Sequence, residues 1–367
     1  MMNSDSSIGT AAAAGVLELA ASANGEPTLD QKVEFLSNPA AYSHVPAEVT
    51  RRETHMSWIF FAGDRVYKLK KPVRFPYLDF STLPHREAAC RAELRLNRRL
   101  ASDVYLGVLP LSAKHHGLAI GANGTVVDWL VVMRRLDESH TLERAIQEKR
   151  IQTWQLDRLV ATLVRFYRRA EPILWSPAIH RRDWRESLFY NRRVLLDPRL
   201  GLPAGLVRRI DEVQRRFIAS RGKLLTRRIL GRRIVDGHGD LRAEHIWLGD
   251  HVRIIDCLEF NPRLRAVDPF DEIAFLSLEC ERLGAAWAGQ YIRRRVTRGL
   301  RDGLTEELFL FYRCHRATLR ARLAIAHLLE ESPRTPEKWP RLARLYLRIA
   351  AADATRLERL LKTRRGR

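Results

Sequence analysis

The sequence predicts an α+β protein in which a small antiparallel sheet with one helix precedes a mainly helical part. Between residues 49 and 133, short apolar runs rich in β-branched and aromatic residues are separated by turn dipeptides such as Gly63-Asp64 and Asn123-Gly124. From Thr141 onward, apolar residues repeat at helical spacing. A chain of 367 residues is long enough to form two such parts.

The elements are expected in the following order. Residues 1–30 are rich in Ala, Ser and Gly and hold few large apolar side chains, so we expect a disordered tail there. A hairpin at 58–61 and 66–69 follows, and then a helix at 86–100. Three more strands complete the predicted sheet, at 104–111, 118–120 and 125–133. Long amphipathic helices are expected at 304–329 and 339–361.

The stretch 235–259 carries the clearest chemical pattern. A short turn holds His238, Gly239 and Asp240, and His245 opens an apolar run five residues after Asp240. The dipeptide Gly249-Asp250 predicts a turn, and a second apolar run ends on Asp256. A hairpin of this kind should bring Asp240 and Asp256 to the same end. Two carboxylates placed together suit metal-assisted phosphate chemistry, one orienting a hydroxyl and the other holding a divalent cation.

The runs HGDLRAEHIWL and IIDCLEF resemble the catalytic-loop and metal-loop signatures of the aminoglycoside phosphotransferase-like kinases. The resemblance covers roughly residues 50–330 and is closer to a separate branch than to the antibiotic-modifying enzymes. It implies a bilobal protein-kinase-like fold, with a small antiparallel-sheet N-lobe and a mainly helical C-lobe. On this basis the expected segments are a tail at 1–30, an N-lobe at 31–132, a hinge at 133–136 and a C-lobe at 137–367.

The same resemblance assigns the nucleotide side of the site. Lys68, on the second strand of the first hairpin, resembles the kinase lysine that contacts the α/β-phosphates, and Glu93 resembles the helix glutamate that pairs with it. Lys70 lies on the same strand face and Glu87 on the same helix, so these two are the rival candidates. Without the other motifs, all four would be ordinary solvated residues. The hinge residues expected to contact an adenine ring are Met133 and Leu136.

The resemblance also assigns the catalytic and metal residues. Asp240 would accept the proton of an acceptor hydroxyl, His238 would brace the loop, and Asp256 would bind Mg²⁺. His245 stands where the family has an asparagine that binds a second metal ion. Imidazole suits Mn²⁺ or Zn²⁺ better than Mg²⁺. Three interpretations stay open: His245 only braces Asp240, it shifts the preference toward Mn²⁺, or the site is catalytically weak.

The composition restricts the setting and the partners. The chain has 64 Lys and Arg against 43 Asp and Glu, a net charge of +21, which favours anionic partners. Nucleic acid is the less favoured of these, because no nucleic-acid-binding signature accompanies the charge. The four cysteines form no CxxC motif, and no apolar run is long enough to span a membrane. No Lys or Arg precedes Lys32, whereas signal and transit peptides carry basic residues near the N-terminus. We therefore expect a cytoplasmic protein without a membrane segment.

The leading hypothesis is an ATP-dependent O-phosphotransferase that uses Mg²⁺, or Mn²⁺, and acts on a hydroxylated small molecule. No P-loop motif occurs in the sequence, so a nucleotide must bind by the kinase-like route. One alternative is a catalytically weak or inactive nucleotide-binding module with a basic partner-binding surface. Another is a metal-dependent phosphohydrolase whose ligands are His238, Asp240, His245 and Asp256.

Overall fold

The computed structural model describes residues 26–114, 117–121, 124–330, 333 and 335–363, and the chain forms two compact units. The sheet unit comprises the described residues up to 138 together with Arg253–Asn261. The helical unit comprises Ser139–Val252 and the described residues from Pro262 onward. The segment Arg253–Asn261, expected in the C-lobe, therefore belongs by its contacts to the sheet unit. The first 25 residues of the predicted tail lie outside the described residues.

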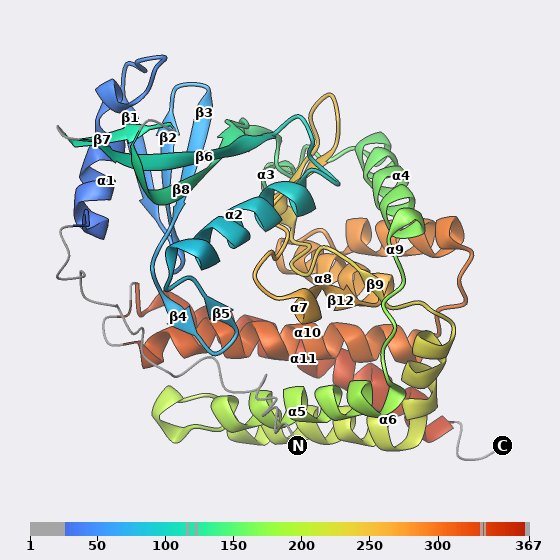
Figure 1. The fold of residues 1–367 in the computed structure, drawn as a ribbon. Helices are drawn as coiled ribbons and strands as arrows, with labels where there is room; N and C mark the ends of the chain where they lie inside the picture. The colour runs from blue at the N-terminus through green and yellow to red at the C-terminus, as the bar shows by residue number, and fades with distance from the viewer. Residues whose placement is uncertain (1–25, 115–116, 122–123, 331–332, 334, 364–367) are drawn as a thin grey trace. The chain divides into compact units, whose positions relative to one another are not determined.

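The sheet unit is built on a six-stranded antiparallel sheet with the strand order β1-β2-β3-β8-β6-β7 (Figure 1). The hairpin and the three further strands predicted from the sequence are all present. The strands are β1 (Val49–Glu53), β2 (Ser57–Ala62), β3 (Arg65–Lys70), β6 (Tyr105–Lys114), β7 (Gly117–Ile120) and β8 (Thr125–Arg134). A separate small hairpin is formed by β4 (Arg74–Phe75) and β5 (Leu78–Asp79).

Two helices cover the two faces of this sheet. Helix α1 (Leu29–Ser37) packs on the face that carries Tyr67 and Leu69 of β3. Helix α2 (Leu83–Asn97) packs on the face that carries Val66. Because side chains alternate along a strand, Lys68 and Lys70 share the face of Val66 and lie toward α2. This alternation is what brings the two lysines of β3 to Glu93 of the helix.

Threonines cap both helices and set where they begin. Thr28 accepts a hydrogen bond from the backbone of Gln31, so α1 starts at Leu29, inside the predicted tail. Thr82 accepts one from His85, and Pro84 fits the first turn, so α2 begins three residues before the predicted start. A buried ion cluster joins both helices to β8, since Asp128 binds Lys32 of α1 and Arg86 of α2 at 2.8 Å each.

The helical unit is organised around α10 (Glu306–Ala326), most of whose residues are buried. Figure 1 shows α11 (Lys338–Thr363) running beside it, and α5, α6 and α8 also contact α10. The remaining helices are α3 (Leu142–Gln147), α4 (Thr153–Arg169), α5 (Pro177–Leu195), α6 (Ala204–Leu230), α7 (Pro262–Arg265), α8 (Pro269–Arg282) and α9 (Ala286–Leu300). None of the described helices is both long and apolar enough to span a lipid bilayer.

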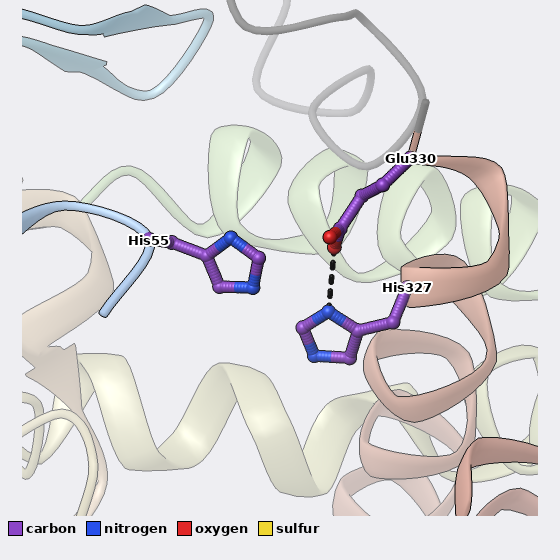
Figure 2. A group of neighbouring side chains, drawn as sticks. All are labelled: His55, His327 and Glu330. Atoms are coloured by element: carbon purple, nitrogen blue, oxygen red, sulfur yellow. Dashed lines mark hydrogen bonds and ion pairs between the residues drawn. The ribbon is translucent and has the colours of Figure 1, made fainter. Parts of the chain in front are cut away.

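The junction between α10 and α11 is held by a short polar contact. After α10, the single turn His327–Leu329 places His327 Nδ1 2.6 Å from Glu330 Oε1 (Figure 2). The ring of Trp339, near the start of α11, stacks on His327 with a centroid separation of 3.9 Å. His327, at the end of α10, therefore contacts both Glu330 and the start of α11.

Short strands frame the predicted catalytic loop. In the helical unit, β9 (Val235–Asp236) pairs with β12 (Ala266–Val267), and β10 (Ile246–Trp247) follows the turn Ala243–His245. Strand β11 (Arg253–Ile254) and Asp256 belong to the sheet unit, whereas Asp240 belongs to the helical unit. That these two carboxylates act at one place therefore remains a prediction.

Candidate active site

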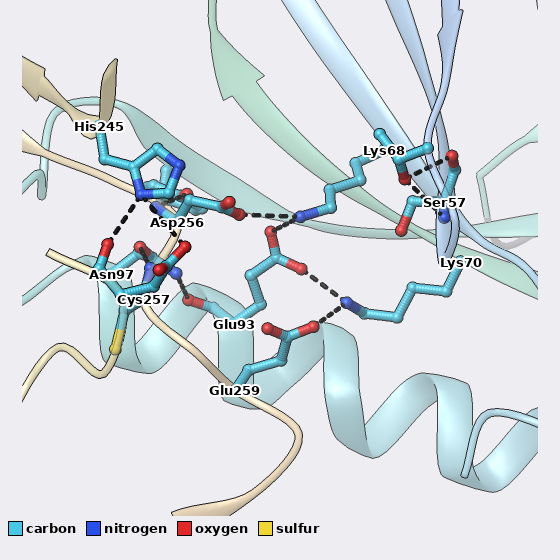
Figure 3. Close-up of polar contacts among 12 residues, drawn as sticks. Ser57, Lys68, Lys70, Glu93, Asn97, His245, Asp256, Cys257 and Glu259 are labelled. Carbon is cyan, nitrogen blue, oxygen red and sulfur yellow. Dashed lines mark hydrogen bonds and ion pairs between the residues drawn. The ribbon is translucent and has the colours of Figure 1, made fainter. Parts of the chain in front are cut away.

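The sheet unit holds an ion-pair cluster around Lys68. This lysine lies on β3, and its Nζ is 2.9 Å from Glu93 Oε1 of α2 and 3.3 Å from Asp256 Oδ1, which follows β11 (Figure 3). The lysine–glutamate contact predicted from the sequence is thus formed, and the rival Glu87 instead pairs with Arg91 on the helix surface. Lys68 thus joins the helix to the segment after β11.

A second lysine extends the cluster. Lys70 Nζ lies 2.7 Å from Glu93 Oε2 and 2.5 Å from Glu259 Oε1. Its side chain is fully buried, and the ammonium group lies 4.8 Å from the centroid of the Phe80 ring. Sequence reasoning treated Lys68 and Lys70 as alternatives, but the structure places both on the same glutamate.

Burial and opposite charge act against each other on these groups. Burial by itself lowers the pKa of Lys68, but the carboxylates of Glu93, Asp256 and Glu259 raise it well above the usual lysine value. Burial also lowers the pKa of Lys70, but the carboxylates of Glu259 and Glu93 outweigh burial and raise this pKa above the usual lysine value. The pKa of Glu93 is lowered, because the attraction of the two lysines outweighs its burial. All three groups are therefore charged at neutral pH.

The backbone around Asp256 is set by side chains of the same unit. Asp256 has a φ of +63°, in the left-handed region that aspartate tolerates better than most residues. Its N–H donates to the hydroxyl of Tyr105 at 3.3 Å, and the N–H of Cys257 donates to Asn97 Oδ1 at 2.9 Å. The Asp256 side chain is 48% exposed, against 14% for Lys68. A half-exposed carboxylate can bind Mg²⁺, and the lysine beside it can bind the phosphates that accompany Mg²⁺.

In the helical unit, the predicted catalytic loop is held through its backbone. Glu272, on α8, accepts hydrogen bonds from the N–H of His238 at 2.9 Å and from the N–H of Gly239, while Tyr167 donates its hydroxyl to the other carboxylate oxygen at 2.8 Å. A Cβ at Gly237 would lie 2.5 Å from Val267 Cγ2 and 2.9 Å from Glu272 Oε2, so a larger residue there would displace one of these side chains. Burial raises the pKa of Glu272, although these hydrogen bonds oppose the increase.

The side chains of the loop surround Asp240. His238 Nδ1 accepts a hydrogen bond from the Asp240 N–H at 3.3 Å, which agrees with a bracing function. Arg242 Nε lies 3.0 Å from Asp240 Oδ2, and its Nη1 lies 2.6 Å from Glu244. The guanidinium of Arg242 thus orients the Asp240 carboxylate. Sequence reasoning missed Arg242, although an arginine two residues after the expected base was a readable signal.

Both ring nitrogens of His245 have partners. Nδ1 lies 2.9 Å from the carbonyl oxygen of Asp240, and Nε2 lies 3.2 Å from Arg242 Nη2. Because a guanidinium only donates and a carbonyl only accepts, this pattern fits a neutral ring that donates through Nδ1 and accepts at Nε2. A metal ion at His245 would have to displace one of these contacts. The arrangement fits the first interpretation of His245, a residue that braces the loop.

Two aspartates at the start of α8 bind arginines of other helices. Asp268 caps α8 by accepting from the Phe270 N–H, and it also binds Arg228 of α6 through two contacts of 2.5 and 2.9 Å. Asp271 binds Arg316 of α10 through two contacts of 2.8 and 2.6 Å. Each arginine is 40 or more residues away in the sequence, so no local pattern indicated these pairs.

The predicted hinge lies at the end of β8. Met133 is buried and pairs in register with Val66 of β3, and Leu136 packs against the same apolar cluster. The N–H groups of Arg134 and Arg135 already donate to the carbonyl oxygens of Val104 and Asp64. Contact of Met133 and Leu136 with an adenine ring remains a prediction.

Comparisons with known proteins bear on the fold. No protein-family model matches the chain. Uncharacterized protein Rv2004c of Mycobacterium tuberculosis is 33% identical over 288 residues, which is 77% of this chain and 56% of that relative. The matched part therefore spans little more than half the length of the relative.

Two solved structures resemble the chain along most of its length. A choline/ethanolamine kinase family protein from Mesorhizobium loti superposes with a TM-score of 0.50 at 14% identity, covering 88% of this chain and 99% of that one. A choline kinase from Cryptosporidium parvum superposes with a TM-score of 0.51 at 10% identity, covering 90% and 96%. The chain has a protein-kinase-like fold. This fold accounts for the antiparallel sheet with α2 on one face and for the helical unit.

Proposed function

We propose that the chain is an ATP-dependent phosphotransferase that moves the γ-phosphoryl group to a hydroxyl of a small molecule. The observation that carries the proposal is the cluster in which Lys68 binds both Glu93 and Asp256. An ordinary surface lysine has no need of two carboxylates, one of them almost fully buried, whereas a phosphate-binding lysine must be held in place by such partners. The HGD loop with its oriented Asp240 supplies the second part of the chemistry.

In this proposal the sheet unit binds the nucleotide phosphates. Lys68 would contact the α/β-phosphates, and Asp256 would hold a Mg²⁺ ion. When bound, the cation offsets charge on the phosphate oxygens. Glu93 keeps Lys68 extended from β3, and Met133 and Leu136 would contact the adenine ring.

The helical unit would position the acceptor. Asp240 accepts a hydrogen bond from the acceptor hydroxyl and takes its proton as the new bond between that oxygen and the γ-phosphorus forms. The bond between the γ-phosphorus and the β–γ bridging oxygen breaks, and ADP leaves. Arg242 and His238 hold the Asp240 side chain and backbone in the required orientation.

The site and the net charge indicate two features of the acceptor. A hydroxyl is required by the general-base role of Asp240. The net charge of +21 disfavours a polycationic acceptor, because like charges repel. The two structural neighbours are named for kinases of choline and ethanolamine, so amino alcohols with a single charge are the first acceptors to try.

The test is a screen for ATP consumption with purified protein over amino alcohols, sugars, nucleosides and aminoglycosides, with Mg²⁺ and Mn²⁺ in parallel. We expect at least one acceptor-dependent reaction, and we expect Asp240→Asn to lower its kcat by about a thousandfold. Retained turnover in Asp240→Asn, or turnover that is indifferent to Lys68→Ala, would contradict the proposed roles.

A nucleotide-binding module without turnover is the second candidate, and His245 is the observation that favours it. This histidine replaces an expected metal-binding amide and has both ring nitrogens bonded within the loop. Under this alternative, ATP binds in the presence of Mg²⁺ but no acceptor in the screen is phosphorylated. His245→Asn is then expected to create or increase turnover.

A further inference from the structure

We infer that Lys70 and Glu259 fasten the segment carrying Asp256 onto the strand carrying Lys68, so that the lysine and the carboxylate form one preassembled half-site. This inference rests on the proposed function and adds a positioning residue, Lys70, to it.

The first support is the order of charges in the cluster. Starting from the solvent side, acidic and basic groups alternate from Asp256 to Lys68, Glu93, Lys70 and Glu259, with successive N–O distances of 3.3, 2.9, 2.7 and 2.5 Å (Figure 3). Two lysines thus lie among three carboxylates. Each inner group has an opposite charge on both sides, so removing one member affects both of its neighbours.

The second support is the difference in exposure between the two lysines. Lys70 is fully buried and packs against Phe80, so its ammonium cannot contact a nucleotide directly. Lys68 and Asp256 form the solvent-facing end of the cluster. Lys70 can therefore act on phosphate binding only through the groups that it holds, Glu93 and Glu259.

The third support is the conformation of the segment between Asp256 and Glu259. These residues form neither helix nor strand, and Asp256 has a positive φ. Regular backbone pairing therefore does not fix the segment. Side chains of the sheet unit hold it instead: Tyr105 binds the Asp256 N–H, Asn97 binds the Cys257 N–H and Lys70 binds the Glu259 carboxylate. Two contacts join the segment to strand β3: Lys68 binds Asp256 at the solvent-facing end, and Lys70 binds Glu259 at the buried end.

The experiment separates a positioning function from a purely structural one. The variant Lys70→Met leaves Glu93 and Glu259 without this cation, so it lowers the unfolding temperature whichever function is correct. The double variant Lys70→Met/Glu259→Gln removes the charge of both partners and is expected to recover much of that temperature. Lys71→Met is the matched control, because Lys71 is the next residue along the chain and pairs instead with Glu53.

The decisive readout is the dissociation constant of ATP measured by calorimetry with and without Mg²⁺. In the wild type and in Lys71→Met we expect Mg²⁺ to tighten ATP binding at least tenfold. In the folded double variant we expect the binding of ATP alone to be retained through Lys68, while the tightening by Mg²⁺ falls below about threefold, because Asp256 is no longer held beside Lys68.

Two other outcomes have distinct meanings. A folded double variant with the full wild-type effect of Mg²⁺ would overturn the inference and make Lys70 a structural residue only. A wild-type protein that binds no ATP under either condition would overturn the proposed function itself. If the double variant does not fold, Glu259→Gln carries the same test, since it keeps the side-chain shape and the Lys70–Glu93 pair.

Discussion

The charge cluster of the sheet unit and the HGD loop of the helical unit are held in place by different means. In the first, side chains bind side chains, and Lys68, Glu93 and Lys70 depend on one another's charge. In the second, a single buried carboxylate, Glu272, binds two backbone N–H groups of the loop. The first arrangement should therefore be sensitive to the loss of charge. The second should be sensitive to the loss of a hydrogen-bond acceptor.

The largest expected effect breaks the sheet-unit cluster at its centre. Glu93→Gln leaves Lys68 and Lys70 close together without the carboxylate between them, and breaking a buried ion pair costs about 3–5 kcal/mol. We expect a loss of that size in the free energy of unfolding, measured by urea denaturation. A loss below about 1 kcal/mol would show that the cluster does not depend on charge.

The next effect breaks the HGD loop. Glu272→Ala removes the one carboxylate oxygen that accepts from the buried N–H groups of His238 and Gly239, and the loss of such an acceptor costs about 1–3 kcal/mol. Glu272→Gln keeps an acceptor oxygen and should cost much less. Equal losses in the two variants would mean that the charge of Glu272 matters more than its hydrogen bonds. That result would contradict the expectation that the loop depends on a hydrogen-bond acceptor.

The pH dependence of stability should differ between the two units, because the histidines whose pKa is lowered by burial lie in the helical unit. Burial lowers the pKa of His315 to about 3 and that of His180 to about 4, and both residues lie in the helical unit. The described histidines of the sheet unit, His44, His55 and His85, are exposed.

Below the ordinary histidine pKa of about 6.5, the unfolded chain binds protons that the folded chain does not. The stabilisation is therefore present above the ordinary histidine pKa, and it is lost as the pH falls toward about 4 for His180 and about 3 for His315. At pH 5 His315 alone should cost about 2 kcal/mol. Urea denaturation at pH 7, 6 and 5 measures this loss. His315→Gln should make the free energy of unfolding depend less steeply on pH. An unchanged slope in that variant would exclude His315 as the source.

The smallest effect is expected at the rival glutamate of α2. Glu87 pairs with Arg91 on the helix surface in an i,i+4 arrangement worth less than about 0.5 kcal/mol. Glu87→Gln is thus the matched control for Glu93→Gln, on the same helix and with the same change of charge. A similar loss in both variants would mean that the helix, and not the cluster, responds to the substitution.

The sequence was sufficient for the features that have a local pattern. Alternation along β3 predicted that Lys68 and Lys70 share a face, and turn residues predicted the strands of the sheet. The HGD run and the apolar run ending in Asp256 predicted the loops that now carry the candidate site. The lysine–glutamate pair became identifiable only through the resemblance to kinases, since each residue alone reads as solvated.

The partners that come from distant parts of the chain could not be predicted in this way. Glu272 follows His238 by 34 residues, and Glu259 follows Lys70 by 189, so only the folded chain brings them together. Arg228 and Arg316 read as ordinary helix arginines, yet each binds a buried aspartate of α8. The segment Arg253–Asn261 lies within the C-lobe range that the resemblance to kinases implies, and its apolar and charged contacts are made with the sheet unit.

The central claim is that phosphate binding belongs to the sheet-unit cluster and proton removal to the loop of Asp240. Calorimetric titration of ATP with Mg²⁺ into the wild type, Asp240→Asn and Lys68→Ala tests it most directly. We predict equal dissociation constants for the wild type and Asp240→Asn, and binding at least tenfold weaker for Lys68→Ala. Binding that Asp240→Asn weakens as much as Lys68→Ala does, or binding that Lys68→Ala leaves intact, would contradict the account.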